Sequence, residues 1–116
     1  LNKKKAETML LKDNPTIKKL RKNGKCQYGY YRIFLYVWKQ SKKNKKMGDY
    51  HFMKQDEDGT WSHKNGPYKV KKIKFKNPYE YIDYKKSKKK SNVVYEICGY
   101  YAVPIITKKN MKSMIE

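Results

Sequence analysis

The two histidines of the chain are the residues best suited to acid–base chemistry, and both lie in the stretch GDYHFMKQDEDGTWSHKNG, residues 48–66. A neutral imidazole can take a proton from a nucleophile, and a second polar group at its other ring nitrogen fixes the tautomer. His51 and His63 could therefore act as base and orienter, hold a metal, or simply pack in a sheet. The choice depends first on whether a turn brings both to one face.

The acidic run between the histidines predicts the turn that joins two strands. Residues 57–59 suit a three-residue hairpin loop, a type I turn followed by Gly59 in the left-handed conformation. In this register Asp56 pairs with Thr60, and the histidines become diagonal neighbours, roughly 7–8 Å apart. A two-residue turn would instead invert the pattern and separate the histidines. In the three-residue case, alternation places four side chains on one face of the sheet: His51, Met53, Trp61 and His63.

The elements around this hairpin follow from apolar runs and from Pro and Gly breaks. They indicate an α+β fold with a helical N-terminus and an antiparallel sheet of about five strands. The chain then divides into an N-terminal helical segment (1–24), a β-sheet domain (25–106) and a basic C-terminal tail (107–116). The predicted elements are a helix over 3–13, a second helical turn over 16–24, a strand over 27–39, a basic loop over 41–48, a strand over 68–75, a loop over 79–91 and a last strand over 92–104.

Lysine dominates the chain, which carries 28 lysines, 2 arginines and a formal net charge of +20. Clustered cations gain affinity for nucleic acid by releasing counterions from its phosphates. Because arginine is scarce, any nucleic-acid contact would be non-specific in sequence. The same composition also arises by codon drift in an AT-rich genome, which would leave a solvated lysine surface. The candidate contact residues are Lys42, Lys43, Lys45, Lys46, Lys85, Lys86, Lys88, Lys89 and Lys90.

Cys26 and Cys98 are too few for a disulfide scaffold. With the two histidines they match the ligand types of tetrahedral zinc, but no CxxC or HxxxH spacing supports such a site. We therefore expect no metal and no cofactor, and buried thiols are the simpler interpretation. No apolar stretch approaches the ~20 residues that span a bilayer, and the chain has no signal-peptide pattern. These observations predict an intracellular or virion-associated protein without a membrane span.

A histidine that opens one strand, a Gly-containing turn and a polar residue that ends the next strand are similar to the hairpin of papain-like NlpC-type and CHAP-type cysteine hydrolases. DYHFMKQDEDGTWSHKNG with the distal CGYYAVP also resembles an uncharacterised group of bacterial and viral proteins, over residues 26–104. The resemblance implies a partial papain-like core. It also implies His51 as general base, His63 as orienter, and Trp61 as a wall of the substrate site.

The sequence departs from the family pattern at the nucleophile. In that pattern the cysteine lies on an N-terminal helix, where the helix end lowers the thiol pKa. Neither Cys26 nor Cys98 precedes a helix in the predicted order of elements. The chain begins at Leu1 rather than at a methionine. Either an upstream segment supplies the cysteine or the activity has been lost, and this chain alone is expected to be inactive.

Two functions follow from these observations. The first is a papain-like hydrolase-related domain, partial or degenerate, that performs amide hydrolysis or acyl transfer where an upstream nucleophile is supplied. The second is a non-enzymatic basic structural or assembly protein of a large particle such as a virion, with protein partners and with nucleic acid as a non-specific ligand. In the second case the tyrosines of residues 79–84 stack on a ligand, or else they pack inside the fold.

Overall fold

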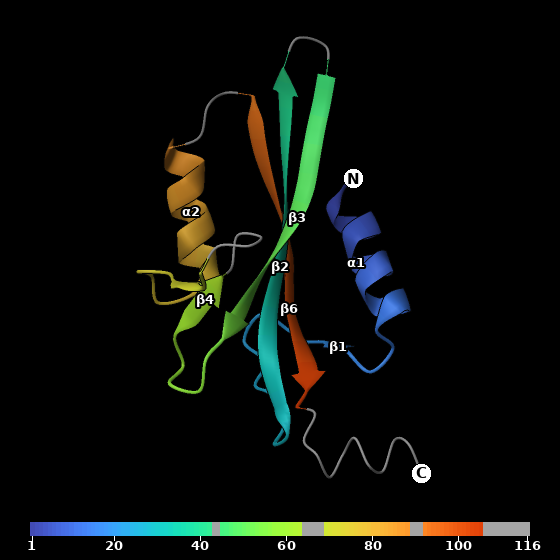
Figure 1. Cartoon of the computed structure of the whole chain (residues 1–116), viewed down its shortest axis with the longest axis vertical. Coiled ribbons are helices and arrows are strands. Elements are labelled where there is room, and N and C mark those ends of the chain that lie inside the picture. Colours follow the sequence, from blue (N-terminus) through green and yellow to red (C-terminus); the bar gives the residue numbers. More distant parts are fainter. Residues whose placement is uncertain (43–44, 64–68, 89–91, 106–116) are drawn as a thin grey trace.

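The computed structural model describes residues 1–42, 45–63, 69–88 and 92–105. These residues form an α+β fold, as the sequence predicts, with one antiparallel six-stranded sheet in the order β1-β6-β2-β3-β4-β5. A helix lies on each side of the sheet (Figure 1). The elements are α1 (Lys3–Asp13), β1 (Lys18–Lys19), β2 (Tyr30–Lys42), β3 (Lys45–Gln55), β4 (Trp61–His63), β5 (Lys71–Lys72), α2 (Pro78–Lys88) and β6 (Val93–Pro104).

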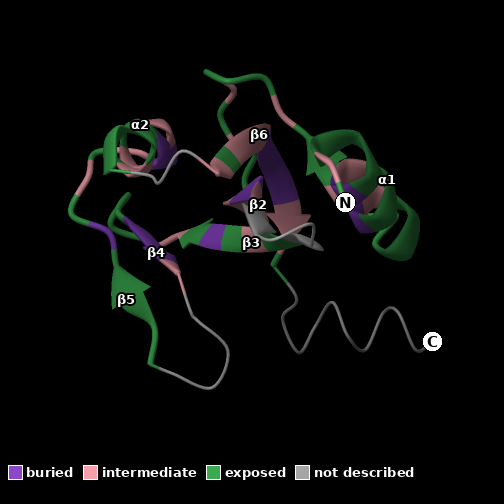
Figure 2. Cartoon of the chain, turned by 90° about the horizontal axis from the view of Figure 1, so that it is seen from above, coloured by how far each residue is buried: buried purple, intermediate pink, exposed green. Residues whose placement is uncertain are grey.

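Strand β2 lies inside the sheet and is buried on both faces. Its run Phe34–Val37 is apolar without alternation, which is typical of a strand covered on both sides. Phe34 and Tyr36 belong to the core under α2, whereas Leu35 and Val37 belong to the core under α1. Figure 2 shows buried residues along β2 and β6, between the two helices.

Helix α1 spans the residues that the sequence predicts. The Asn2 side chain accepts a hydrogen bond from Lys5 N–H at 2.8 Å and caps the first turn. Ala6 and Leu10, which are one helical turn apart, are buried against β2 and β6. The helix therefore covers β2 and β6 on its sheet face, and a concavity lies between α1 and β3.

Helix α2 lies where the sequence predicts a loop over residues 79–91, and that prediction is wrong. The Asn77 side chain accepts a hydrogen bond from Glu80 N–H at 3.0 Å, and Pro78 takes the first helical position, which does not need an N–H. Ile82 is fully buried against the sheet. Tyr79 and Tyr81 pack against the same core. Tyr84 is 47% exposed, and its ring lies 5.3 Å from that of Phe75. Two of the three tyrosines of residues 79–84 therefore pack in the fold.

The predicted second helical turn over residues 16–24 is also wrong, because the strand β1 lies within it. Lys18 and Lys19 pair with β6. Leu20 N–H continues this pairing by donating to the Tyr100 carbonyl at 2.9 Å. Within residues 1–24, all of which the structure describes, α1 is the helix and β1 is an edge strand of the sheet.

Three further predictions concern the lysine-rich segments. The basic loop predicted over residues 41–48 is wrong, because β2 and β3 remain paired as far as Lys42 and Lys45. In the described part of the strand predicted over 68–75, Lys71 and Lys72 pair with β4, and Ile73 N–H donates to the Trp61 carbonyl at 2.9 Å. The basic tail predicted over 107–116 lies outside the described residues. The domain boundaries drawn after residues 24 and 106 stay predictions.

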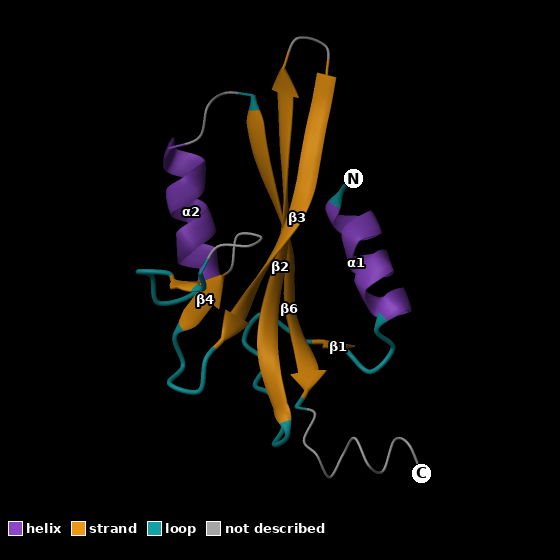
Figure 3. Cartoon of the chain, viewed as in Figure 1, coloured by secondary structure: helices purple, strands orange, loops and turns teal. Residues whose placement is uncertain are grey.

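The β2–β3 hairpin gives the chain its long shape, with extents of 53 × 30 × 29 Å. Figure 3 shows these two strands running past the ends of both helices. Within the described residues, no helix has the length and apolar character needed to cross a membrane.

A β-bulge in β6 decides which of its side chains face each helix. The register with β2 shifts between Leu35 and Tyr36, so that Cys98 is the extra residue, and Gly99 adopts a positive φ of 127°. Before the bulge Ile97 packs toward α2, and after it Tyr100 does so. Cys98 falls on the α1 side.

Candidate functional site

The histidine hairpin has the three-residue loop that the sequence predicts. Asp56 N–H donates to the Thr60 carbonyl at 2.7 Å, and Gly59 N–H donates to the Asp56 carbonyl at 2.9 Å. Gly59 has a φ of 86°, the left-handed conformation that glycine adopts without strain. Gln55 pairs with Trp61 across the strands. The predicted register of β3 and β4 is therefore confirmed.

Both imidazoles lie on the sheet face that α2 covers. The His51 ring stacks on Tyr36, with centroids 5.4 Å apart, and lies beside Trp38 at 6.3 Å. The His63 ring meets the edge of Tyr81 of α2 at 5.8 Å. We call these five residues and Tyr95, whose ring is 6.4 Å from that of Tyr36, the imidazole cluster.

One hydrogen bond fixes the tautomer of His51. The Trp38 indole Nε1–H donates to His51 Nε2 at 2.6 Å. An indole nitrogen can only donate, so His51 Nε2 carries the lone pair and the neutral ring carries its proton on Nδ1. A general base needs a free lone pair directed at the nucleophile. In this arrangement the one lone pair of His51 is already engaged by Trp38, so the geometry does not favour the base role implied by the resemblance.

His63 lies among cations. It pairs directly with Lys71 across β4 and β5, and Lys85 follows Tyr81 by one turn of α2. Burial is the largest cause that lowers the pKa of His63, and the charges of His51, Lys71 and Lys85 lower the pKa further. The ring is therefore neutral at neutral pH in the free protein.

Tyr36 and Tyr81 of the imidazole cluster are protonated hydroxyls. Burial is the main cause that raises the pKa of Tyr36 far above its usual range, and a hydrogen bond to Tyr81 adds to it. Burial also raises the pKa of Tyr81, while its hydrogen bond with Tyr36 acts in the opposite direction. Neither hydroxyl therefore provides a phenolate at neutral pH.

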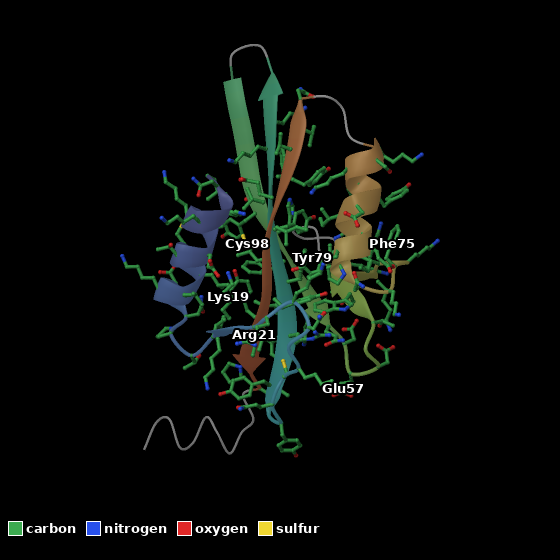
Figure 4. The ribbon with its side chains drawn as sticks, turned by 180° about the vertical axis from the view of Figure 1, so that it is seen from behind. Lys19, Arg21, Glu57, Phe75, Tyr79 and Cys98 are labelled. Carbon is green, nitrogen blue, oxygen red and sulfur yellow. The ribbon has the colours of Figure 1, made fainter. Side chains whose placement is uncertain are left out.

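The two cysteines lie away from the imidazole cluster. Cys98 lies in the bulge on the opposite face, where its thiol donates to the Lys3 carbonyl at 3.5 Å (Figure 4). Cys26 precedes β2 and lines a concavity of about 600 Å³ at the start of that strand, together with Arg32. Arg32 is four residues before Tyr36, or roughly 13 Å along the strand. The zinc ligand set considered from the sequence is not brought together, and the described residues contain no group of three metal-ligating side chains.

Neither thiol is activated, which predicts slow alkylation. Burial raises the pKa of Cys98 to about 11, and it also raises the pKa of Cys26, partly offset by the Arg32 charge. The thiolate is the reactive form, so at pH 7.5 both cysteines are expected to react with iodoacetamide more slowly than free cysteine. Mass spectrometry of the alkylated peptides measures the two rates. A rate at either site above that of free cysteine would show an activated nucleophile.

Trp61 is a core residue. It is 1% exposed, and its ring stacks on Tyr100 with centroids 5.3 Å apart and 26° between the planes. The Arg32 guanidinium lies 5.4 Å from the Trp61 ring and 4.8 Å from the Tyr100 ring. A ring this enclosed has no free face for a substrate, so its role as a substrate-site wall stays a prediction that its burial does not favour.

The lysines predicted to contact nucleic acid divide into two groups. Lys85, Lys86 and Lys88 form the basic last turn of α2. The second group is not described in full. The structure gives only the backbone of three lysines in β2 and β3, namely Lys42, Lys45 and Lys46. The remaining three lie outside the described residues: Lys43, Lys89 and Lys90.

Sequence reasoning missed Trp38, Lys71 and Tyr81 as partners of the histidines. The alternation of β2 carried a signal for Trp38, because Trp38 and Tyr36 share a face. Lys71 and Tyr81 could be found only with β5 and α2 correctly placed. Comparisons with protein families, with curated proteins and with solved structures found no match for the chain.

Proposed function

We infer that this chain is a non-enzymatic basic module that binds the phosphate backbone of nucleic acid. The observation that carries the proposal is the convergence of three cation-capable side chains from three elements. His63 of β4 pairs with Lys71 of β5, and Lys85 of α2 lies one turn from the Tyr81 ring that His63 contacts. We call these three residues the cationic site.

The positive charges around His63 are not balanced by an acid that acts on its pKa. No carboxylate is among the groups that influence His63, and each charge that does so is positive. Like charges held together cost free energy, which a bound anion recovers. Phosphate oxygens would accept from the lysine ammonium groups, and protonation of His63 would add a third donor.

The rest of the described surface also has cations in excess. Three ion pairs occur among the described residues, at 2.6–2.9 Å: Lys19–Glu7, Lys39–Glu96 and Lys72–Asp58. The last turn of α2 contributes Lys86 and Lys88 beside the cationic site, outside these pairs. Lysine ammonium groups bind phosphate as point charges, so we propose contact without sequence specificity. We also propose that the protein lies inside a cell or a virion, in an assembly with other proteins.

Removal of the two lysines of the cationic site is the direct test. We expect Lys71→Gln with Lys85→Gln to weaken binding of a fluorescent single-stranded oligonucleotide. It should also reduce the slope of log affinity against log salt by about 1.4, since each contact to a single strand contributes roughly 0.7. Fluorescence anisotropy over a salt series measures both quantities. Lys12→Gln with Lys25→Gln removes the same charge elsewhere and is the matched control.

Two outcomes would overturn the proposal, and one further measurement tests it independently. A wild-type chain that does not bind at low salt would leave codon drift as the origin of the charge. An equal loss in both double variants would show a diffuse charge effect and no cationic site. The His63 ring gives an independent reading, because bound inorganic polyphosphate stabilises the imidazolium and is expected to raise the His63 pKa in an NMR titration.

A papain-like hydrolase-related domain is the second candidate function. Its support is the confirmed hairpin, with both histidines on one face. The bond from Trp38 to His51 and the placement of both cysteines weigh against activity in this chain alone. Sequencing the gene upstream is the test: a cysteine at the start of a helix would support the hydrolase, and an open reading frame that begins at Leu1 would exclude it.

A further inference from the structure

A groove between α1 and β3 lies on the opposite face of the sheet from the imidazole cluster. Tyr50 and Phe52 of β3 form one wall. The other wall belongs to α1 and its C-cap, and consists of Ala6, Met9, Leu10, Asp13 and Asn14. Tyr50 is 43% exposed, Phe52 is 37% exposed, and Met9 on the α1 wall is 50% exposed. Three large apolar side chains therefore border one groove and remain accessible.

The groove is the size of one six-membered ring. Its volume is about 120 Å³, somewhat smaller than the cavity of roughly 150 Å³ that holds a benzene molecule in an engineered protein. The rings of Tyr50 and Phe52 meet edge to face, with centroids 5.6 Å apart and 77° between the planes. This geometry leaves ring surface free for a flat ligand, which Met9 can cover from the other wall.

Lysines lie next to the groove on the α1 side. A second concavity shares Met9 and is lined by Asn2, Lys4, Lys5 and Thr8. Lys4 and Lys5 take no part in the ion pairs found among the described residues. The acidic group of the groove, Asp13, belongs to the other end of α1. An apolar slot thus continues into a cationic surface.

We propose that this groove is a stacking site for one pyrimidine base of a single-stranded nucleic acid, with a neighbouring phosphate on Lys4 and Lys5. Stacking on aromatic rings beside a basic surface is how proteins hold single strands without reading their sequence. An uncharged apolar partner would leave the two lysines unused. A second copy would bring together two chains of charge +20, which repel each other. This site rests on the proposed function and adds base contact to it.

The test compares two polyanions, a short deoxythymidine oligonucleotide and inorganic polyphosphate, which has no bases. We expect Phe52→Leu to weaken oligonucleotide binding by about 5- to 150-fold, the range measured for the loss of one stacked base. Polyphosphate binding should be unchanged. Phe52→Trp keeps an aromatic face and should bind the oligonucleotide at least as tightly as wild type. Tyr28→Ala, at a fully exposed tyrosine, is the matched control and should change neither affinity.

The two ligands separate failure of this site from failure of the proposed function. Wild-type binding of neither polyanion would overturn both. Binding of both, with Phe52→Leu and Tyr28→Ala equally without effect, would overturn the stacking site and leave phosphate binding intact. If Phe52→Leu lowered the affinities for the oligonucleotide and for polyphosphate equally, the variant would have a disturbed fold and not a lost stacking contact. This result would also count against the site. Circular dichroism of each variant at the assay temperature establishes that the chain is folded.

Discussion

Trp61→Ala is expected to lower the free energy of unfolding by about 3–5 kcal/mol, the usual cost of removing a large buried aromatic ring. Trp61 is enclosed in the core under α2, where it contacts both the Tyr100 ring and the Arg32 guanidinium. The loss is large beside the roughly 5–15 kcal/mol that stabilises a typical domain. Urea denaturation followed by circular dichroism measures it.

Two variants make the Trp61 result interpretable. Trp61→Phe keeps a ring on Tyr100 and should lose less stability than Trp61→Ala. Tyr28→Ala removes a fully exposed ring and should stay within about 0.5 kcal/mol of wild type. If Trp61→Ala lowered the free energy of unfolding by less than about 1 kcal/mol, the ring would not be a core residue. That result would support the predicted role of Trp61 as a wall of a substrate site.

The hairpin and α1 could be predicted from sequence because local chemistry specifies both. Gly59 adopts the left-handed conformation that ends a three-residue loop, and the loop then fixes the register of β3 and β4. In α1, the Asn2 cap and the spacing of the buried residues Ala6 and Leu10 both indicate the same helix, which ends before Asn14–Pro15. Each of these signals lies within a few residues of the structure that it determines.

Helix α2 could not be predicted from apolar periodicity because it has little of it. Its buried side chains are Pro78, at the first position, and Ile82. The other core contacts come from tyrosines, whose rings pack while their hydroxyls stay polar. The cap formed by Asn77 and Glu80, with Pro78 at the first position, was the usable signal. An Asn-Pro pair is also typical of a turn, so the two structures compete for the same residues.

The partners of the histidines depend on long-range register. His51 meets Trp38 because β2 and β3 pair Tyr36 with His51, a relation set by the whole hairpin. His63 meets Tyr81 only because α2 lies on that face. The sequence could therefore place the two imidazoles on one face, but it could not show that the lone pair of one is engaged and that the other lies among lysines.

The bulge in β6 limits prediction in the same way. Strict alternation from Tyr95 onward would put Tyr101 on the α2 face, but the extra residue at Cys98 moves Tyr101 to the α1 face. Gly99, with its positive φ, is the one local sign of this change. The position of Tyr101 matters because this residue holds α1, and with it one wall of the groove.

Tyr101→Ala is expected to cost roughly 3–5 kcal/mol of stability and to loosen α1 from the sheet. Tyr101 is 0% exposed and packs with Ala6 and Leu10 of α1. Its hydroxyl donates to Glu7 Oε1 at 3.0 Å, and Glu7 also pairs with Lys19 of β1 at 2.6 Å. Urea denaturation measures the stability, and amide hydrogen exchange shows whether α1 opens before the rest of the chain.

Tyr101→Phe separates the ring from the hydroxyl. It keeps the packing and removes one hydrogen bond, so the expected loss is about 1 kcal/mol, with Glu7 still held by Lys19. If the two variants lost equal stability, the hydroxyl rather than the ring would hold α1. Helix α1 carries Lys4, Lys5 and Met9, so a loosened helix in Tyr101→Ala should also weaken oligonucleotide binding. The cationic site lies on the other face of the sheet, so Tyr101→Ala should still bind polyphosphate.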